Sequence, residues 1–364
     1  MESPVISFLV SLSVLGFLVM VHELGHMVVA RRSGVRILRF SIGFGPKIFS
    51  WKRGETEYAI SAIPLGGYVK MAGEHHGERS NRPWEYLSKP IGVRAKIIVA
   101  GPLVNYVVAL ATLWIVFLIG YPEMLPVVGK TMAEMPARAA GLQENDRIKE
   151  IDGAAIGTWD DMSEIIAASA DKPLTFSVER EGAVRRVQMT PRLKDITDPL
   201  GRRRTVGLIG IEPKGDFEYV RAGPVEAVWR TIEQQNEWVV ETFVAFRSLL
   251  TGRLSMQDSM TGPIGIMYLT SEAVQIGIMP VLFIASLLSL SLAIFNLLPI
   301  PILDGGHLFF LALEKLRGKP VSINIQERSA QVSMVLLLAL VLTTCVNDVT
   351  RYGLLDRIIG WFRG

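Results

Sequence analysis

A metal-binding motif inside an apolar run is the feature of this sequence that most restricts its fold. The residues His22-Glu23-Leu24-Gly25-His26 lie within a stretch, from about residue 5 to residue 30, that is long enough to cross a membrane as a helix. In a helix, positions i and i+4 project from one face, so His22 and His26 can offer ring nitrogens to one metal ion with Glu23 beside it. A charged group in hydrocarbon costs at least about 2.5–3.5 kcal/mol, and is rarely kept there without a task. The motif therefore predicts a metal site in a membrane helix.

The chemistry that this motif suits is hydrolysis. Zinc held by three protein ligands keeps a fourth position for water and lowers the pKa of that water toward about 7. A neighbouring carboxylate, here Glu23, can take the proton as the water attacks a carbonyl carbon. The alternative is a chance match in which the two histidines only pack or cap. The apolar surroundings favour the metal site.

Composition places the chain among membrane proteins. Of its 364 residues, 49% are hydrophobic and 20% are charged, with a mean hydropathy of +0.33, which is too apolar for an ordinary soluble enzyme. We predict four membrane-spanning helices, within residues 1–32, 97–121, 278–298 and 329–349. The start Met1-Glu2-Ser3-Pro4 has no basic residue, so the first span is not expected to be a cleaved signal peptide.

The distribution of basic residues predicts the orientation of these spans. Residues 31–96 contain thirteen Lys or Arg against five Asp or Glu, which indicates that this loop is cytoplasmic. Both termini and residues 122–277 are then outside, and the basic residues 315–328 return to the cytoplasm. Basic residues beside a membrane indicate contact with anionic lipid, and there is no motif for nucleic acid, so none is expected as a partner. The single cysteine, Cys345, excludes an internal disulfide framework.

The cytoplasmic loop, residues 33–96, predicts a small β-sheet associated with the membrane. Strands are expected near residues 47–51, 56–63 and 68–71, because β-branched and aromatic residues there are broken by glycines. An open edge of such a sheet could add an extended peptide as another strand, and a purely structural hairpin is the alternative. His75 and His76 are assigned to a solvated loop.

Residues 122–200 predict a compact α+β domain. Strands near residues 127–132, 174–179 and 184–190 surround a helix near residues 159–168. The sequences P-A-R-A-A-G-L at 136–142 and I-D-G at 151–153 resemble the PDZ domains of bacterial proteases, which usually bind an extended chain end by strand addition. A bulky spacer that limits access is the alternative. Residues 201–277 are expected to form a linker containing an amphipathic helix at 224–250.

Two histidines do not complete a zinc site, and the segment 299–328 offers a third ligand. Pro299 and Pro301 interrupt the backbone at the end of the third span, and broken backbone at membrane depth is tolerated only beside protein or water. Asp304 lies at this point and can supply a carboxylate ligand. Alternatively, Asp304 is the N-cap of a helix from 305 to 316. His307 is the rival third ligand, but we expect it to orient the loop or to donate to Asp304.

Two asparagines fall within predicted spans. The amide of Asn296 could bind a substrate backbone or a developing oxyanion, or could contact another helix. Asn105, which follows Gly101-Pro102, is assigned to packing between helices.

These motifs together resemble the site-2 proteases, the intramembrane zinc metalloproteases of peptidase family M50. The resemblance covers most of the chain and, beside the PDZ insertion, rests on H-E-x-G-H at 22–26, I-P-L-G-G-Y-V-K-M at 63–71, A-G-P-x-x-N at 100–105 and N-L-L-P-I-P-x-L-D-G-G-H at 296–307. It implies that His22, His26 and Asp304 bind Zn²⁺ and that Glu23 is catalytic. It further implies that substrate contacts Asn296 and the hairpin residues Leu65, Gly66, Gly67 and Tyr68. Enterobacterial members carry two tandem PDZ domains, whereas one complete signature is present here.

The expected fold is a polytopic α-helical membrane protein with four transmembrane helices, a cytoplasmic membrane-associated β-hairpin sheet, an extracytoplasmic α+β PDZ domain and a C-terminal tail at 350–364. The resemblance implies a bacterial plasma (inner) membrane enzyme with its active site toward the cytoplasm. It would cleave transmembrane segments of single-pass proteins, such as anti-sigma factors or signal-peptide remnants. A membrane-anchored PDZ adaptor with a structural or vestigial metal site is the alternative, and a transporter is disfavoured because no inverted repeat is visible.

Overall fold

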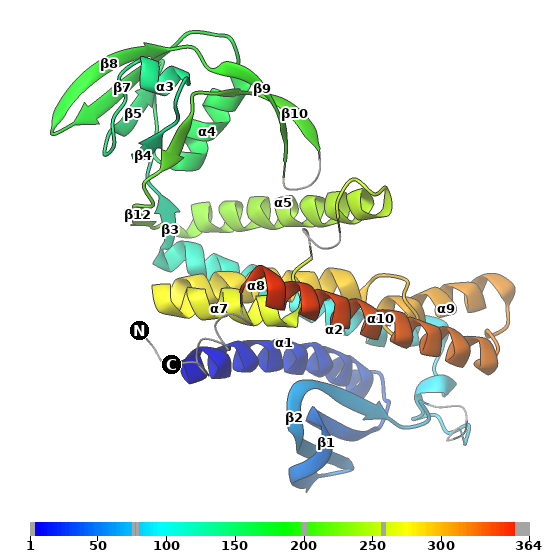
Figure 1. Ribbon diagram of the computed structural model, residues 1–364. Helices are drawn as coiled ribbons and strands as arrows, with labels where there is room; N and C mark the ends of the chain where they lie inside the picture. Colours follow the sequence, from blue (N-terminus) through cyan, green and yellow to red (C-terminus); the bar gives the residue numbers. More distant parts are fainter. Residues whose placement is uncertain (1–3, 75–76, 78–79, 199–201, 256–259, 354–364) are drawn as a thin grey trace, which may run out of the picture. The chain divides into compact units, whose positions relative to one another are not determined.

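The computed structural model describes residues 4–74, 77, 80–198, 202–255 and 260–353 (Figure 1). The chain forms two compact units, which are treated separately below. The first, called the helical unit, comprises Met1–Val116, Arg230–Val239 and Met260–Gly364. The second, called the β-rich unit, comprises Phe117–Trp229 and Val240–Ser259.

Four helices among the described residues are long and apolar enough to cross a membrane: α1 (Pro4–Arg32), α2 (Ile91–Ile119), α8 (Ile278–Asn296) and α10 (Ile323–Arg351). Their number and order confirm the prediction of a polytopic membrane protein. Two shorter helices accompany them, α7 (Pro263–Ile276) and α9 (Asp304–Arg317). The sequence analysis assigned the residues of α7 to the linker, whereas the structure has a separate helix there. Gly277 separates α7 from α8. Its φ of 145° is a backbone conformation that favours glycine.

Buried polar contacts connect the helices of this unit. The Ser286 and Ser289 hydroxyls of α8 each donate to a backbone carbonyl of α2, at Ala109 and Asn105 respectively, over 2.8 Å. The fully buried carboxylate of Asp348, near the end of α10, accepts hydrogen bonds from two backbone amides at the start of α7. A carboxylate at a helix N-terminus accepts hydrogen bonds from amides that have no partner within the helix, and it interacts favourably with the positive end of the helix dipole. These hydrogen bonds join α8 to α2 and α10 to α7.

A sheet lies against the end of α1 in the helical unit (Figure 1). Its strands are β1 (Ile37–Arg53) and β2 (Thr56–Met71), followed by the short 3₁₀ helix η2 (Tyr86–Ser88). Both strands are longer than the three predicted, and they fold back so that Phe40 of β1 pairs with both Tyr58 and Val69 of β2. A buried apolar cluster joins the sheet to α1 and α2: Met27, Ala30, Val35, Ile37, Phe40, Val69, Met71 and Ile97. His75 and His76 lie outside the described residues.

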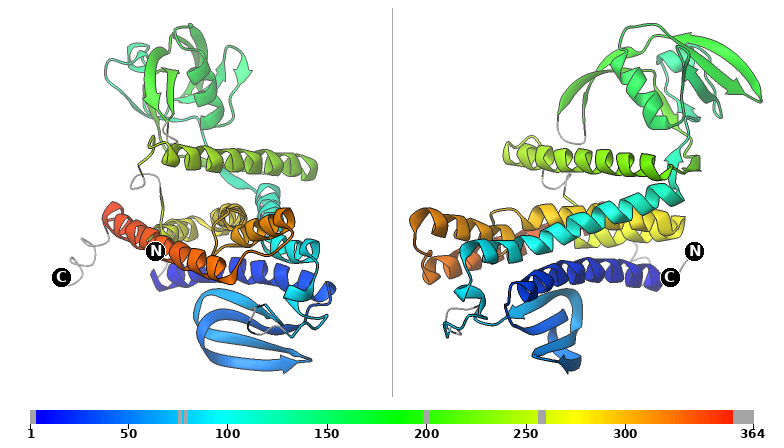
Figure 2. Two further views of the ribbon diagram at one scale, coloured as in Figure 1. Left: turned by 90° about the vertical axis from the view of Figure 1, so that its right-hand side faces the viewer. Right: turned by 180° about the vertical axis from the view of Figure 1, so that it is seen from behind.

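Figure 2 shows the strands of the β-rich unit, largely in green, from two further sides. Among them is a four-stranded sheet in the order β6-β5-β7-β8. Its strands are β5 (Arg147–Ile151), β6 (Ala154–Ala155), β7 (Leu174–Arg180) and β8 (Ala183–Met189). Helix α4 (Trp159–Ala168) contributes Met162 and Ile166 to the core beneath the sheet, and begins with a capping box between Thr158 and Asp161. The short helix α3 (Pro136–Ala139) completes this core through Ala137.

Further strand pairs extend the β-rich unit beyond residue 200. They join β3 (Tyr121–Met124) to β12 (Phe217–Val220), β4 (Val128–Thr131) to β11 (Ile211–Pro213), and β9 (Arg192–Thr197) to β10 (Arg203–Leu208). Residues 203–220, which the sequence analysis treated as linker, therefore return to pair with earlier strands. The long helix α5 (Pro224–Leu250) follows, in the segment where an amphipathic helix was expected.

Candidate metal centre

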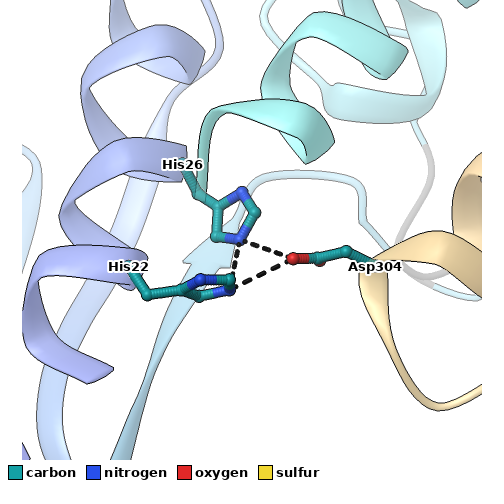
Figure 3. A group of neighbouring side chains, drawn as sticks. All are labelled: His22, His26 and Asp304. Atoms are coloured by element: carbon teal, nitrogen blue, oxygen red, sulfur yellow. Dashed lines mark hydrogen bonds and ion pairs between the residues drawn. The ribbon is translucent and has the colours of Figure 1, made fainter. Parts of the chain in front are cut away.

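Three potential metal ligands converge from the two ends of the chain. His22 and His26 project from one face of α1, and Asp304 is the first residue of α9 (Figure 3). The Nε2 atoms of the two histidines are 3.2 Å apart, and Asp304 Oδ2 lies 3.1 Å from His22 Nε2 and 3.3 Å from His26 Nε2. These three form the candidate metal-binding group among the described residues. Ligand atoms at about 2.0–2.1 Å from a tetrahedral zinc ion would lie about 3.3 Å from one another, so the spacing fits zinc.

The protonation pattern of this cluster also favours a cation. The ring nitrogen Nδ1 of His26 lies 2.8 Å from the carbonyl oxygen of Ile97, and only a protonated nitrogen can donate to a carbonyl. In a neutral ring, Nε2 then carries a lone pair. Asp304 Oδ2 is buried and has no hydrogen bond of good geometry despite its nearness to both rings. Converging lone pairs without an aligned proton donor are the arrangement that a metal ion satisfies.

Glycines allow α2 to lie directly against the histidines. A Cβ atom on Gly25 of α1 would come within 2.5 Å of the Ala100 carbonyl oxygen of α2. A Cβ on Gly101 would lie 2.3 Å from His26 Nε2 and 2.8 Å from His22 Cε1. Both distances are far below normal contact, so the two helices can approach at this depth only with glycine at these positions. The sequence analysis quoted both glycines within motifs but gave them no role.

Asn105 also contacts the candidate ligands in a way that the sequence did not predict. It is fully buried on α2, and its side-chain Nδ2 lies 3.4 Å from Nδ1 of His22. Packing between helices, which the sequence predicted for Asn105, does describe its backbone, since its carbonyl accepts from Ser289. Its amide, however, faces a metal-ligand candidate. Its separation from His22 along the chain explains why no local pattern revealed this contact.

Glu23 and the cluster share one cavity of about 1000 Å³. The half-buried Glu23 lies beside β2, where an added Cβ on Gly67 would be 3.6 Å from its Cγ, and the backbone of Val69 hydrogen-bonds its carboxylate. The cavity continues past the cluster along α9 to the first turns of α10 at Ile323 and Gln326. The cavity therefore places a carboxylate, three potential ligands and a strand in one space.

The strand that borders this cavity is the end of β2. Residues 67–71 pair on one side with the first residues of β1, and Tyr68, Val69 and Met71 line the cavity. The amide of Met71 donates to the carboxylate of Glu74 over 3.1 Å rather than to another strand. Gly66, with a φ of 110°, packs against the ring of Phe44. The side chain of Leu65 lies outside the described part of the chain.

The remaining predicted residues are placed on the far side of the cluster. Asn296, the last residue of α8, lines the cavity, as does His307, but His307 is not part of the three-residue group. The alternative reading of Asp304 as an N-cap is wrong: the N-cap is Leu303, and no side chain caps this helix. An aspartate carboxyl is ordinarily ionised at neutral pH, so Asp304 offers an anionic oxygen to the cluster.

An ion pair ties α9 to α2 at the same cavity. Arg94 donates to Glu314 through Nη1 over 3.1 Å and through Nη2 over 2.5 Å, and the two side chains are only 10% and 17% exposed. Arg94 Nε also donates to the Lys89 carbonyl, which fixes the guanidinium at the start of α2. A bidentate pair of this kind defines both distance and angle. It holds the helix that begins with Asp304 against the helix that lies behind the histidines.

Comparison with protein families gives a match over most of the chain. The sequence profile of peptidase family M50 matches residues 10–340. A protein of Rhizobium meliloti named as a zinc metalloprotease is 36% identical over 338 residues, covering 88% of this chain and 90% of that protein.

Two further relatives carry more specific names. The zinc metalloprotease RasP of Geobacillus kaustophilus is 32% identical over 431 residues, which cover 96% of this chain and 98% of that protein. The regulator of sigma-E protease RseP of Escherichia coli is 30% identical over 451 residues, with 95% and 98% covered. The chain is thus similar along nearly its whole length to proteins named as zinc proteases.

Proposed function

The chain belongs to peptidase family M50, and from this membership and the geometry of the metal centre we propose that it cleaves transmembrane segments of single-pass membrane proteins. It is a zinc metalloprotease of the site-2 type, which acts in regulated intramembrane proteolysis. Anti-sigma factors and signal-peptide remnants are the substrate classes we propose. The relative named regulator of sigma-E protease supports the first of these.

The observation that carries the proposal is the convergence of His22, His26 and Asp304 beside Glu23 in one cavity. We assign the first three as zinc ligands. Zinc, when bound, supplies a Lewis acid that polarises a carbonyl group and acidifies water. Glu23 borders the same cavity, and takes the proton of the attacking water and passes it to the leaving amide nitrogen. Water is the only reactant besides the peptide bond, and these two proton transfers complete the hydrolysis.

The edge of β2 is the proposed binding site for the substrate backbone. A transmembrane helix has to unwind before its carbonyls can be attacked, because helical hydrogen bonds occupy them. The Met71 amide, which now donates to Glu74, can instead donate to a carbonyl of an added strand, with Gly67 and Tyr68 beside it. Asn296 offers an amide across the cavity for the same unwound segment. We propose that the substrate also contacts Leu65 and Gly66, which precede Gly67 and Tyr68 in β2.

The topology that we propose follows from the charge distribution. The basic loop at 33–96, with its sheet, is cytoplasmic, and both termini are outside. The β-rich unit is then extracytoplasmic, and we propose that it is a PDZ domain of residues 122–200 together with the strands up to Val220. Its proposed role is selection of substrates by their external parts, through an added peptide strand. In this proposal, hydrolysis of the peptide bond takes place in the helical unit.

The test is Glu23→Gln, examined for both zinc content and cleavage of a transmembrane segment in detergent. Because the three ligands remain, bound zinc should be unchanged, while cleavage should fall by about 10²-fold or more, since the residue that moves the proton is lost. A Glu327→Gln variant, at an exposed position on the same cavity, serves as a control and should keep cleavage. Normal cleavage by Glu23→Gln would disprove the catalytic assignment. Wild-type protein that holds zinc but cuts no segment would favour the membrane-anchored adaptor.

A further inference from the structure

Among the described residues, Asn105 is the buried side-chain amide that faces the candidate metal ligands. It has no exposed surface, and its Nδ2 lies 3.4 Å from His22 Nδ1. Its other amide atom, Oδ1, is buried and has no hydrogen-bond partner. An unpaired buried carbonyl oxygen costs about 1–3 kcal/mol, so an amide kept in this state is expected to have a partner in the working protein.

The two histidines use their ring nitrogens in the same way. His26 presents Nε2 to the cluster and its Nδ1 to the Ile97 carbonyl, which is on α2. His22 also presents Nε2 to the cluster, and the group that its Nδ1 meets on α2 is Asn105. When Nε2 holds a metal, Nδ1 carries the proton and must donate. Only the Oδ1 atom of Asn105 can accept that proton, because an amide NH₂ is a donor.

Exchange of the two amide atoms by a half-turn of the Asn105 side chain gives the proton on His22 Nδ1 an acceptor. It brings Oδ1 to the position that Nδ2 now occupies, within reach of His22 Nδ1. The backbone of Asn105 does not have to move, since its carbonyl stays bonded to the Ser289 hydroxyl of α8. Helix α2 therefore supplies an acceptor to each histidine, a backbone carbonyl for one and a side-chain carbonyl for the other.

We propose that Asn105 is a positioning residue for the metal centre, which accepts the Nδ1 proton of His22 and fixes that ring with Nε2 toward the metal. The proposal rests on the assignment of His22 as a zinc ligand. Groups that hold the outer nitrogen of a metal-binding histidine typically change metal affinity by about 10–100-fold when removed. The effect passes through His22 alone, because Asn105 does not reach the cluster itself.

A purely packing role for Asn105 makes opposite predictions for two substitutions. Leucine has a similar volume and no polar atoms, so as a packing residue Asn105→Leu would be tolerated or even stabilising. Aspartate would then be harmful, because it buries a charge without a donor. For a positioning residue the order reverses: aspartate keeps an oxygen that accepts from Nδ1–H, and leucine does not.

The experiment measures zinc affinity of the full-length protein in detergent by competition with a chelator of known affinity. Asn105→Leu should bind zinc about 10–100-fold more weakly than wild type, whereas Asn105→Asp should stay near wild type. Asn105→Ala is the second variant without an acceptor, in case the leucine variant does not fold. Ser286→Ala is the matched control, since it removes a buried hydrogen bond between α8 and α2 away from His22, and its zinc affinity should not change.

The outcomes separate this inference from the assignment on which it rests. Unchanged zinc affinity in Asn105→Leu and Asn105→Ala would overturn it, as would an equal loss in Asn105→Asp. A His22→Ala variant is measured in parallel. If that variant retained zinc, the proposed ligands would be wrong; if it lost zinc while Asn105→Leu kept it, only the role of Asn105 would be wrong.

Discussion

Asp146 in the β-rich unit and Asp304 in the helical unit are two carboxylates in different surroundings. Asp146 of the β-rich unit has no exposed surface, and it accepts hydrogen bonds from Nε and Nη2 of Arg180 and from the Gln143 amide. Asp304 of the helical unit is partly exposed, but its oxygen Oδ2 is buried and has no aligned donor. The first carboxylate is satisfied within the protein and maintains the fold. The second is left to be satisfied by a ligand.

The two sites also differ in how the chain assembles them. Asp146 and Arg180 are 34 residues apart in one contiguous segment: Asp146 directly precedes β5, and Arg180 ends β7, the strand that pairs with β5. His22 and Asp304 are brought together from opposite ends of the chain, and α2 has to lie against the histidines. The Asp146–Arg180 pair is formed within one segment, so it should tolerate changes elsewhere in the chain. The metal centre is assembled by several helices, so it depends on how closely each pair of these helices packs. The following variants test this contrast, from the largest expected effect on the metal centre to the smallest.

The largest effect is expected from Gly101→Ala. The new Cβ would lie 2.3 Å from His26 Nε2, so the ring or the whole of α2 must move, and both zinc binding and cleavage should fall by about 100-fold or more. Gly92→Ala, at the start of the same helix, is the matched control because a Cβ there meets nothing within 4 Å. Zinc content by metal analysis, compared between the two alanine variants, is the measurement. Equal zinc content in both would show that the close approach is not required.

Loss of the third ligand should have the next largest effect. Asp304→Ala removes one of three proposed ligands and should reduce zinc affinity more than Asp304→Asn, because an amide oxygen is a weaker ligand than a carboxylate. His307→Ala should change zinc affinity by less than about tenfold, since His307 lies in the cavity but outside the ligand group. Chelator competition on the three variants gives the order. A greater loss in His307→Ala than in Asp304→Ala would make His307 the ligand.

The ion pair between α2 and α9 should have a smaller effect. Glu314→Gln weakens the bidentate contact with Arg94, so the start of α9 is held less firmly, and zinc affinity should fall by roughly 3–10-fold. Lys315→Gln, at an exposed neighbouring position, controls for the change in charge and should leave zinc affinity unaltered. If Glu314→Gln matches Lys315→Gln in zinc affinity, the ion pair contributes to stability alone.

A change in the β-rich unit should leave the metal centre unaffected. Asp146→Ala leaves Arg180 and the Gln143 amide without their acceptor, so this unit should unfold at a temperature lower by roughly 5 °C or more. Zinc content should be that of wild type. Thermal unfolding followed by limited proteolysis, together with metal analysis, checks both parts. Zinc loss in Asp146→Ala would show that the two units depend on each other.

Prediction from the sequence succeeded where the signal is local or compositional. The apolar runs predicted the four helices, because a helix in a membrane needs about 20 apolar residues in sequence. The spacing of His22 and His26 predicted their shared face, and the prolines before Asp304 marked the break at which it lies. The linker prediction for 203–220 was less successful, because short strands that pair with distant partners carry little pattern of their own.

The sequence by itself determined that this protein crosses a membrane, that two histidines share a helix face and that a carboxylate follows a broken helix. Hydropathy and helical periodicity are properties of neighbouring residues, so no tertiary contact is needed to read them. Only the tertiary structure decided which groups of α2 meet the histidines. The contacts at Gly25, Gly101 and Asn105 depend on the small separation between α1 and α2. That separation is set by close packing of the whole bundle, which no single segment of sequence specifies.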